Sequence, residues 1–394
     1  MPYYRRNLYV LSLTVFLATL SWNQVMPFLP KFIKQIGGAQ NLDYWVGVVF
    51  AMQSLAAILM QPLWGKLGDS YGRKPMIIRA GICLAGVYFG MSICRAPWQL
   101  AICRFLNGAL TGFIPGSMAL IATNTPEQHA PRYIATVQTT SNVGLIIGPM
   151  VGAVLAMRFG YRGSMVVSGT AVMLSTMLVW LLVQEPNKVS AVEKTSLIED
   201  FGIALASRVQ RSVLLVVMLA WMYPAAVNAY LILHLETLGG CRPDWFPGII
   251  FALPAAAFVL MAYQWTRVGE WWGYDKTIAV GLISGGIGGL TLYVVHNIWL
   301  FAVIYFVMSI FTASIGPSVA AVTCTRVDES FRGRAYGIQQ SAGTTGSLLA
   351  YIVASLTAAR WGYGAIFLLT GGMLLVGGLM FRGMARRWEK RPIA

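Results

Sequence analysis

Long apolar blocks alternate with short polar connections along the whole chain. A helix needs about 20 apolar residues to cross the hydrocarbon core of a bilayer, and twelve of the blocks reach that length. We therefore predict an all-α membrane protein with twelve transmembrane helices. These helices cover residues 7–29, 44–64, 76–96, 98–122, 135–157, 164–184, 212–235, 245–265, 277–296, 298–322, 335–358 and 364–383.

Composition agrees with this pattern. Of 394 residues, 57% are hydrophobic and only 11% are charged, whereas soluble domains carry about 25% charged residues. The net charge of +15 does not indicate a nucleic-acid partner, because the cytoplasmic loops of membrane proteins collect Lys and Arg. The five cysteines show no metal-ligand spacing, so neither a metal site nor a required disulfide is predicted.

The positions of the cations set the expected orientation. An even number of spans places both termini on one side, and that side then carries 21 Lys and Arg against seven on the other. Because cytoplasmic loops hold the excess of cations, we predict cytoplasmic termini. The first span follows only six residues and no cleavage motif, so we expect it to be retained. We expect a monomer in a bacterial plasma membrane, with the lipid bilayer as its surroundings.

One hydrophilic connection, residues 185–211, divides the chain into two halves of six spans, 1–184 and 212–394. Part of the connection, near 196–207, has the pattern of an amphipathic helix on the membrane surface. The halves also repeat each other. The segment Trp64–Asp69 returns 201 residues later as Trp265–Glu270, and Arg158–Tyr161 returns 202 residues later as Arg360–Tyr363. We interpret this as a duplication that gives two pseudo-symmetric six-helix bundles related by an axis along the membrane normal.

The loop between the second and third spans has the pattern G-x-L-x-D-x-x-G-R-K. Its glycines allow a sharp turn, and its carboxylate is placed to meet a cation or the positive end of a helix. The alternative is an ordinary basic loop. The residues singled out here as a candidate conformational switch are Gly65, Asp69, Gly72, Arg73 and Lys74.

Arg104 is the one cation that we place well inside a span. Counted from Trp98, where the span begins, it lies about 9 Å deep. A charge at that depth is costly and marks a candidate functional residue. The alternative is a side chain that extends back to the nearer membrane interface.

The fifth span contains the pattern G-x-x-x-G-P-x-x-G, formed by Gly144, Gly148, Pro149 and Gly152. Glycines four residues apart share one helix face and allow another helix to approach closely. A generic packing face is therefore an alternative to a functional motif. Span eleven has no copy of the pattern, because Leu349 and Ala350 stand in the Gly-Pro place.

These motifs, the length and the duplication resemble the major facilitator superfamily, and within it the twelve-span drug:proton antiporters. The motif of the fifth span departs from that branch at Ala153, where glycine is usual. The resemblance implies alternating access around a central site, with the proton gradient as the energy source and no cofactor. It also implies that Arg104 takes part in proton coupling. Asp69 would dock near Arg334–Gly337 and hold the cytoplasmic side closed.

Polar and aromatic residues inside the spans are candidates for the substrate pocket, although each one alone is more often an interhelical hydrogen bond or filler. As a set they describe a neutral cavity rich in amides, aromatic rings and methionine, which suits varied amphipathic ligands. The candidates are Asn23, Gln24, Gln53, Asn107, Thr111, Gln138, Asn142, Trp221, Tyr223, Asn228, Tyr230, Tyr305, Met308, Gln339 and Gln340.

All fourteen acids fall in loops or at span ends, so no carboxylate is expected at mid-membrane. His234 and Glu236, at the outer end of span seven, are candidates for coupling, and an interfacial anchor is the alternative. A proton-driven exporter of drugs or amphipathic molecules is the leading hypothesis. A dedicated transporter for one anionic or zwitterionic metabolite, siderophore or lipid-like solute is the second, and an uncoupled facilitator the third. No catalytic or phosphate-binding motif occurs, so an enzyme is not predicted.

Overall fold

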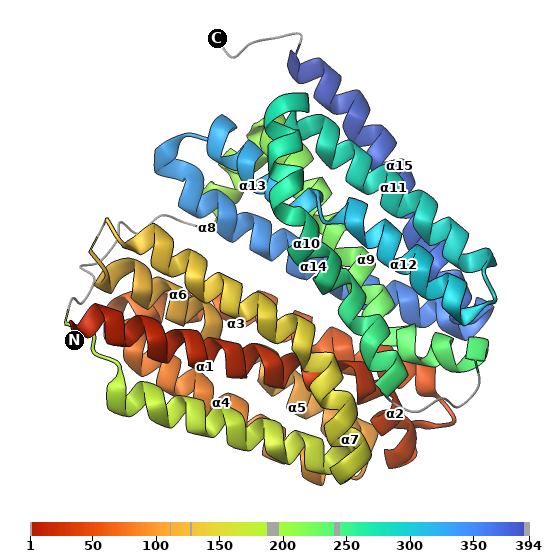
Figure 1. Ribbon diagram of the computed structural model, residues 1–394, viewed down its shortest axis with the longest axis horizontal. Helices are drawn as coiled ribbons and strands as arrows, with labels where there is room; N and C mark the ends of the chain where they lie inside the picture. Colours follow the sequence, from red (N-terminus) through yellow and green to blue (C-terminus); the bar gives the residue numbers. More distant parts are fainter. Residues whose placement is uncertain (1, 111, 127, 187–196, 240–244, 390–394) are drawn as a thin grey trace. The chain divides into compact units, whose positions relative to one another are not determined.

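The computed structural model describes residues 2–110, 112–126, 128–186, 197–239 and 245–389, and its regular elements there are all helices (Figure 1). The chain forms two compact units. The N-terminal unit comprises Met1–Glu193 with Pro243–Ala252, and the C-terminal unit comprises Lys194–Arg242 with Leu253–Ala394. The predicted domain boundaries at residues 184 and 212 stay a prediction.

The N-terminal unit begins with a long helical segment that two prolines bend but do not end. Its elements are α1 (Tyr3–Val25), the 3₁₀ turn η1 (Met26–Phe28), α2 (Leu29–Ile33), the π turn η2 (Lys34–Gly38), α3 (Leu42–Tyr71), α4 (Arg73–Ile93), α5 (Pro97–Leu110), α6 (Phe113–Asn124) and α7 (Ala130–Leu182). The predicted end of the first span at residue 29 is therefore too early, because Pro27 and Pro30 sit in first-turn positions, where a helix tolerates proline.

The C-terminal unit has the same plan. Its elements are α8 (Leu197–Ala206), α9 (Arg208–Gly239), α11 (Tyr274–Val294), α12 (Ile298–Thr312), α13 (Ile315–Arg326), α14 (Glu329–Trp361) and α15 (Gly364–Glu389). Helix α10 (Trp245–Trp272) contributes its first turns to the N-terminal unit and the rest to the C-terminal unit.

Eleven helices in the described part of the chain are long and apolar enough to cross a membrane. One of them, Arg132–Leu182, has 51 residues, which is about 77 Å of helix against a hydrocarbon core of about 30 Å. It is broken at Gly160, whose φ of 67° and ψ of 176° are not helical. The segment therefore supplies two crossings, in agreement with the predicted spans 135–157 and 164–184, and the described part of the chain then has twelve membrane-length segments.

The predicted spans 98–122 and 298–322 correspond to two membrane-length segments, α5 with α6 and α12 with α13. The first is interrupted at Gly112, whose φ of 146° is not helical, whereas Ala313 and Ser314, between α12 and α13, keep helical angles. Hydropathy could not reveal the break at Gly112 because the residues around it stay apolar. In transporters such interrupted helices bring unpaired backbone groups to functional positions.

The charged loop between the second and third spans is almost entirely helical, contrary to expectation. Helix α3 runs to Tyr71 and α4 begins at Arg73, so Gly72 alone makes the turn, with φ of 99°. Gly273 makes the equivalent turn between α10 and α11, with φ of 104°. Only glycine adopts such angles at little cost, which explains why this glycine stands in both repeats.

The N-terminal unit is held together around α1, which lies along α7 (Figure 1). Its core contains Leu11 and Val15 of α1, Ile77 of α4, Leu120 of α6 and Val179 of α7, all of them inaccessible to solvent. In the C-terminal unit the glycine-rich run of α11 lies against α15, where Gly289 faces the backbone of Gly371. Small residues therefore permit the closest helix contacts in this unit.

Helix α8 corresponds to the amphipathic helix expected near 196–207. Its Ala204 is fully buried in a cluster with Leu214 of α9 and Phe331, Ala335 and Ile338 of α14. The apolar side of α8 therefore packs on two helices of its own unit. It does not lie only on the membrane surface, as the sequence indicated.

The backbone at Gly160 gives a stability prediction. We expect Gly160→Ala to lower stability by about 1–3 kcal/mol, because this region of φ and ψ is essentially restricted to glycine. Crowding does not contribute, since nothing lies within 4 Å of the added Cβ. The control is Gly86→Ala in α4, where the space is equally open and the backbone helical, so that alanine should be neutral or stabilising. Thermal unfolding of the detergent-solubilised protein measures the stability of both variants. Equal changes in their melting temperatures would contradict the prediction.

Candidate functional site

The glycine motif of α7 packs directly on α1. A Cβ added to Gly144 would meet the backbone of Phe16 and Leu20, one added to Gly148 would meet Asn23, and one added to Gly152 would meet the backbone of Gln24. The three glycines thus form a flat strip along two turns of α1. Pro149 and Ala153, beside the strip, contact Gly248 in the part of α10 that belongs to this unit.

Two candidate pocket residues, Asn23 and Gln24, lie at this contact. Gln24 is 1% exposed, and its side-chain amide donates to the carbonyl of Ser164 at 3.4 Å and to the hydroxyl of Ser168. Asn23 donates to the carbonyl of Thr19 at 2.8 Å. Gln24 therefore ties α1 to the second half of α7, as an interhelical hydrogen bond would.

Arg104 of α5 lies inside the N-terminal unit with only 3% of its side chain exposed. Its guanidinium carbon is 5.4 Å from the ring centroids of both Trp22 (α1) and Phe50 (α3). One terminal nitrogen is 3.5 Å from the sulfur of Met26. The side chain is enclosed by aromatic rings and a thioether inside the unit.

Asn107 follows one turn after Arg104 and is 1% exposed. Neither its amide nitrogen nor its amide oxygen has a hydrogen-bond partner among the described residues, and the same holds for the Gln53 side-chain oxygen. Gly108 packs against the backbone of Gln53, so α3 and α5 touch at this level. The structure thus brings Gln53, Asn107 and Arg104 to one polar region.

The amides and the guanidinium define what this region can bind. The guanidinium supplies only donors, whereas the amides supply both donors and acceptors. Together with the surrounding rings they can hold a polar or anionic group attached to an apolar body. Tyr88 of α4, buried with its hydroxyl unpaired among the described residues, is close enough to interact electrostatically with Arg104.

In the C-terminal unit, four of the candidate pocket residues on α9 and α12 are buried: Tyr223, Tyr230, Tyr305 and Met308. The ring of Tyr230 stacks on that of Tyr363. The Tyr223 hydroxyl lies 3.3 Å from the sulfur of Met308. Trp221 is half-exposed and its ring lies over Gly343 of α14.

The remaining candidates are distributed more widely. Gln339 is buried and donates to Thr323 at 2.8 Å, Asn142 is half-buried, and Gln138, Asn228 and Gln340 are exposed. Thr111 lies outside the described residues.

His234 is buried among aromatic rings of the C-terminal unit. It is 6% exposed, and its ring lies 5.0 Å from that of Phe367 (α15) and 5.5 Å from that of Phe301 (α12). Neither ring nitrogen has a hydrogen-bond partner among the described residues. Glu236, two residues further along α9, is half-buried. The sequence could not show that two phenylalanines from distant helices cover the histidine.

The turn at Gly72 is fixed by a residue that sequence reasoning left in the linker. The carboxylate of Glu185 accepts hydrogen bonds from the backbone N–H groups of Arg73 at 2.7 Å and Lys74 at 2.8 Å. It therefore caps α4, whose first N–H groups have no partner within the helix. The side chain of Asp69 and the surroundings of Gly65 are not described, so the role of these residues in the switch stays a prediction.

Sequence analysis assigned no structural role to Trp64, Arg79 or Trp265, which make specific contacts. The indole N–H of Trp64 donates to the carbonyl of Ala109, at the break between α5 and α6. The guanidinium carbon of Arg79 lies 3.3 Å from the centroid of the Trp64 ring. In the second repeat Trp265 donates to the carbonyl of Ile310, near the end of α12, at 2.7 Å. The repetition of this tryptophan, 201 residues apart, was the available signal.

A model of the Major Facilitator Superfamily matches residues 11–240 and 246–393. The chain belongs to this family. It is therefore a secondary transporter and a multi-pass membrane protein of a family that consists of transporters and not enzymes.

Two bacterial proteins are similar to this chain over nearly its whole length. The chain is 26% identical over 376 residues to the multidrug resistance protein MdtG of Proteus mirabilis, with 94% of each chain covered. It is 28% identical over 377 residues to MdtG of Salmonella arizonae, with 94% and 93% covered.

Solved structures support the fold. A bacterial homologue of the human lysosomal transporter Spinster matches with a TM-score of 0.84 and 14% identity, over 100% of this chain and 99% of that one. The nucleoside transporter NupG matches with a TM-score of 0.83 and 13% identity, over 96% and 99%. At these identities the likeness concerns the fold alone. It confirms the predicted all-helical architecture.

The Glu185 cap gives a second prediction. We expect Glu185→Gln to lower stability by about 1–2 kcal/mol, because an amide has one acceptor oxygen and no charge to offer two N–H groups at a helix start. Hydrogen exchange at the amides of Arg73 and Lys74 should accelerate. Glu270→Gln, an exposed acid with the same charge change, is the control. Unchanged exchange in Glu185→Gln would show that the carboxylate does not support the turn.

Proposed function

We propose that the protein is a proton-coupled exporter of drugs or similar amphipathic small molecules, working by alternating access. The near full-length similarity to proteins named multidrug resistance protein supports this proposal, although the identity is only 26–28%. The glycine motif of α7, which resembles that of the drug:proton antiporters, supports export as the direction. A small-molecule substrate and protons are the partners in this proposal.

The observation that carries the proposal is the polar region around Arg104. Burying polar atoms without hydrogen bonds costs free energy, and inside a membrane protein such groups are retained for function. Asn107 has two such atoms and Gln53 has one among the described residues. A substrate with hydrogen-bonding groups would pair these atoms, which makes them suitable binding partners.

The surroundings of the polar region suit an amphipathic ligand. Trp22, Phe50 and Met26 present flat or flexible apolar surface beside the guanidinium. Such surface adapts to ligands of different shape, whereas the guanidinium and amides orient their polar end. We assign the substrate contacts in this unit to Arg104, Asn107 and Gln53.

The proton needs a separate site because an arginine does not lose its proton in proteins. We propose His234 for this role, since its two ring nitrogens are buried and unpaired among the described residues. Besides Phe301 and Phe367, its surroundings include Tyr293 of α11 and the backbone of Gly364 of α15, and His296 is the titratable group close enough to influence it electrostatically. Glu236 on the same helix does not share its face, because it is two residues away.

A dedicated transporter for one anionic or zwitterionic solute is the second candidate. Arg104 favours it, since a buried guanidinium prefers a carboxylate or phosphate. Competition distinguishes the two functions: an exporter of drugs is inhibited weakly by many amphipathic compounds, whereas a dedicated transporter is inhibited strongly by one.

The role of Arg104 is testable by transport. In proteoliposomes with an imposed pH gradient, we expect Arg104→Gln to reduce gradient-driven drug uptake about tenfold or more, because a charge-assisted contact to the substrate is lost. Arg95→Gln, an exposed cation near the start of the same span, is the matched control and should transport normally. Transport that ignores the gradient, together with a silent Arg104→Gln, would exclude the proposed antiport.

The role of His234 is testable by an aromatic replacement. Phenylalanine fits a niche formed by Phe301 and Phe367, so we expect His234→Phe to keep its thermal stability. If His234 binds the coupling proton, this variant transports without responding to the pH gradient. His129→Phe, at a histidine that also stacks on aromatic rings (Tyr4 and Tyr133), is the control and should respond to the gradient normally. A full response in His234→Phe would assign the histidine to packing alone.

A further inference from the structure

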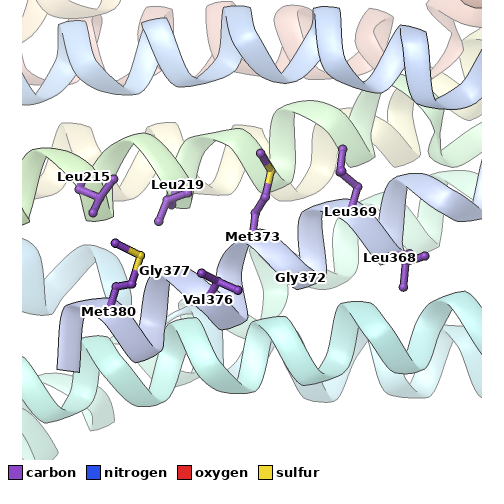
Figure 2. A pocket seen from close by; sticks show the side chains of 9 residues that line it. All are labelled: Leu215, Leu219, Leu368, Leu369, Gly372, Met373, Val376, Gly377 and Met380. Atoms are coloured by element: carbon purple, nitrogen blue, oxygen red, sulfur yellow. The ribbon is translucent and has the colours of Figure 1, made fainter. Parts of the chain in front are cut away.

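A groove of about 540 Å³ runs between α9 and α15 of the C-terminal unit (Figure 2). Its lining is apolar throughout and includes Leu215 and Leu219 on α9 and Met373, Val376 and Met380 on α15. No part of the function proposed above uses this groove.

Glycines determine the shape of the groove. At Gly377 the helices touch, because a Cβ there would collide with the side chain of Leu219. At Gly372, five residues earlier in α15, nothing lies within 4 Å of an added Cβ. The two helices therefore leave an open channel along the Gly372 side, with flexible methionines at its wall.

The length of the groove corresponds to one leaflet of a bilayer. From Leu368 to Met380 the lining of α15 rises by about 18 Å at 1.5 Å per residue. Half of the hydrocarbon core is about 15 Å thick. An elongated apolar ligand of leaflet depth, such as an acyl chain, matches both the length and the lining.

Cations stand at one end of the groove. Arg208 and Arg211 precede Leu215 and Leu219 on α9 at spacings of three and four residues, which places all four on one helix face. Both arginines are exposed, and so is Arg382, two residues beyond Met380 on α15. Basic residues at the end of a span attract anionic lipid headgroups.

We propose that this groove binds one anionic phospholipid, with an acyl chain along Gly372, Val376 and Met380 and the phosphate at Arg208 and Arg211. The lipid comes from the leaflet in which these arginines lie. The proposal is independent of the transported substrate and of the coupling residues.

The purified full-length protein in mild detergent tests this proposal by lipid-induced thermal stabilisation. Dioleoyl phosphatidylglycerol and dioleoyl phosphatidylcholine share their acyl chains and differ in headgroup charge. We expect half-maximal stabilisation at about tenfold lower concentration of phosphatidylglycerol, because each cation near the headgroup favours the anionic lipid. Equal concentrations for the two lipids would mean general lipid contact only and would overturn the proposal.

Variants test the arginines at the headgroup and the groove for the acyl chain independently. R208Q/R211Q should abolish the preference for phosphatidylglycerol, whereas R267Q/R326Q, which removes two exposed arginines elsewhere, should keep it. Gly372→Leu should weaken the binding of both lipids about tenfold or more, because the leucine side chain fills the groove. It should not unfold the protein, because the space is open and leucine is a better helix former than glycine. Gly86→Leu, an equally open glycine of α4, is its control. Unchanged lipid binding in Gly372→Leu would exclude the groove as the site.

Discussion

The hydrocarbon core of a membrane offers no hydrogen-bond partners, and this constraint explains most of the structure. Backbone groups are satisfied within helices, so every place where a helix stops needs another partner. Glu185 accepts from two N–H groups at the start of α4. Trp64 and Trp265 donate to carbonyls near the ends of α5 and α12. These side chains allow the chain to turn and break while remaining stable in lipid.

The same constraint explains why the buried polar atoms of Asn107 and His234 indicate function. Where the fold supplies partners at a helix end, it does so with side chains from distant parts of the sequence. At Asn107 and His234 it supplies none among the described residues, although both side chains are buried. Close packing is available elsewhere, as the glycine strip of α7 on α1 shows. An incompletely satisfied polar group beside well-packed helices is therefore a sign of binding or proton transfer.

Hydropathy and the internal repeat were sufficient to predict the number of spans and the duplicated plan. They could not locate the break at Gly112 in the fourth span, because a broken helix is as apolar as a continuous one. Burial of His234 was hidden for a related reason. Its neighbours Phe301 and Phe367 lie 67 and 133 residues away in the sequence, and only the packing of three helices covers its ring. The cap at Glu185 was missed because the residue was counted with the linker.

The glycines illustrate how one residue type serves different physical purposes in this fold. Gly72 and Gly160 supply backbone angles that other residues avoid. Gly152 and Gly289 supply close approach, since a Cβ would meet the backbone of a neighbouring helix. Gly372 supplies open space. Substitution of a glycine with special backbone angles, or of one at a close helix contact, affects folding or packing. Substitution of an open glycine such as Gly372 instead changes what the surface can bind. A larger side chain introduced at an open glycine of a membrane-spanning helix can therefore block a ligand site without disturbing the fold.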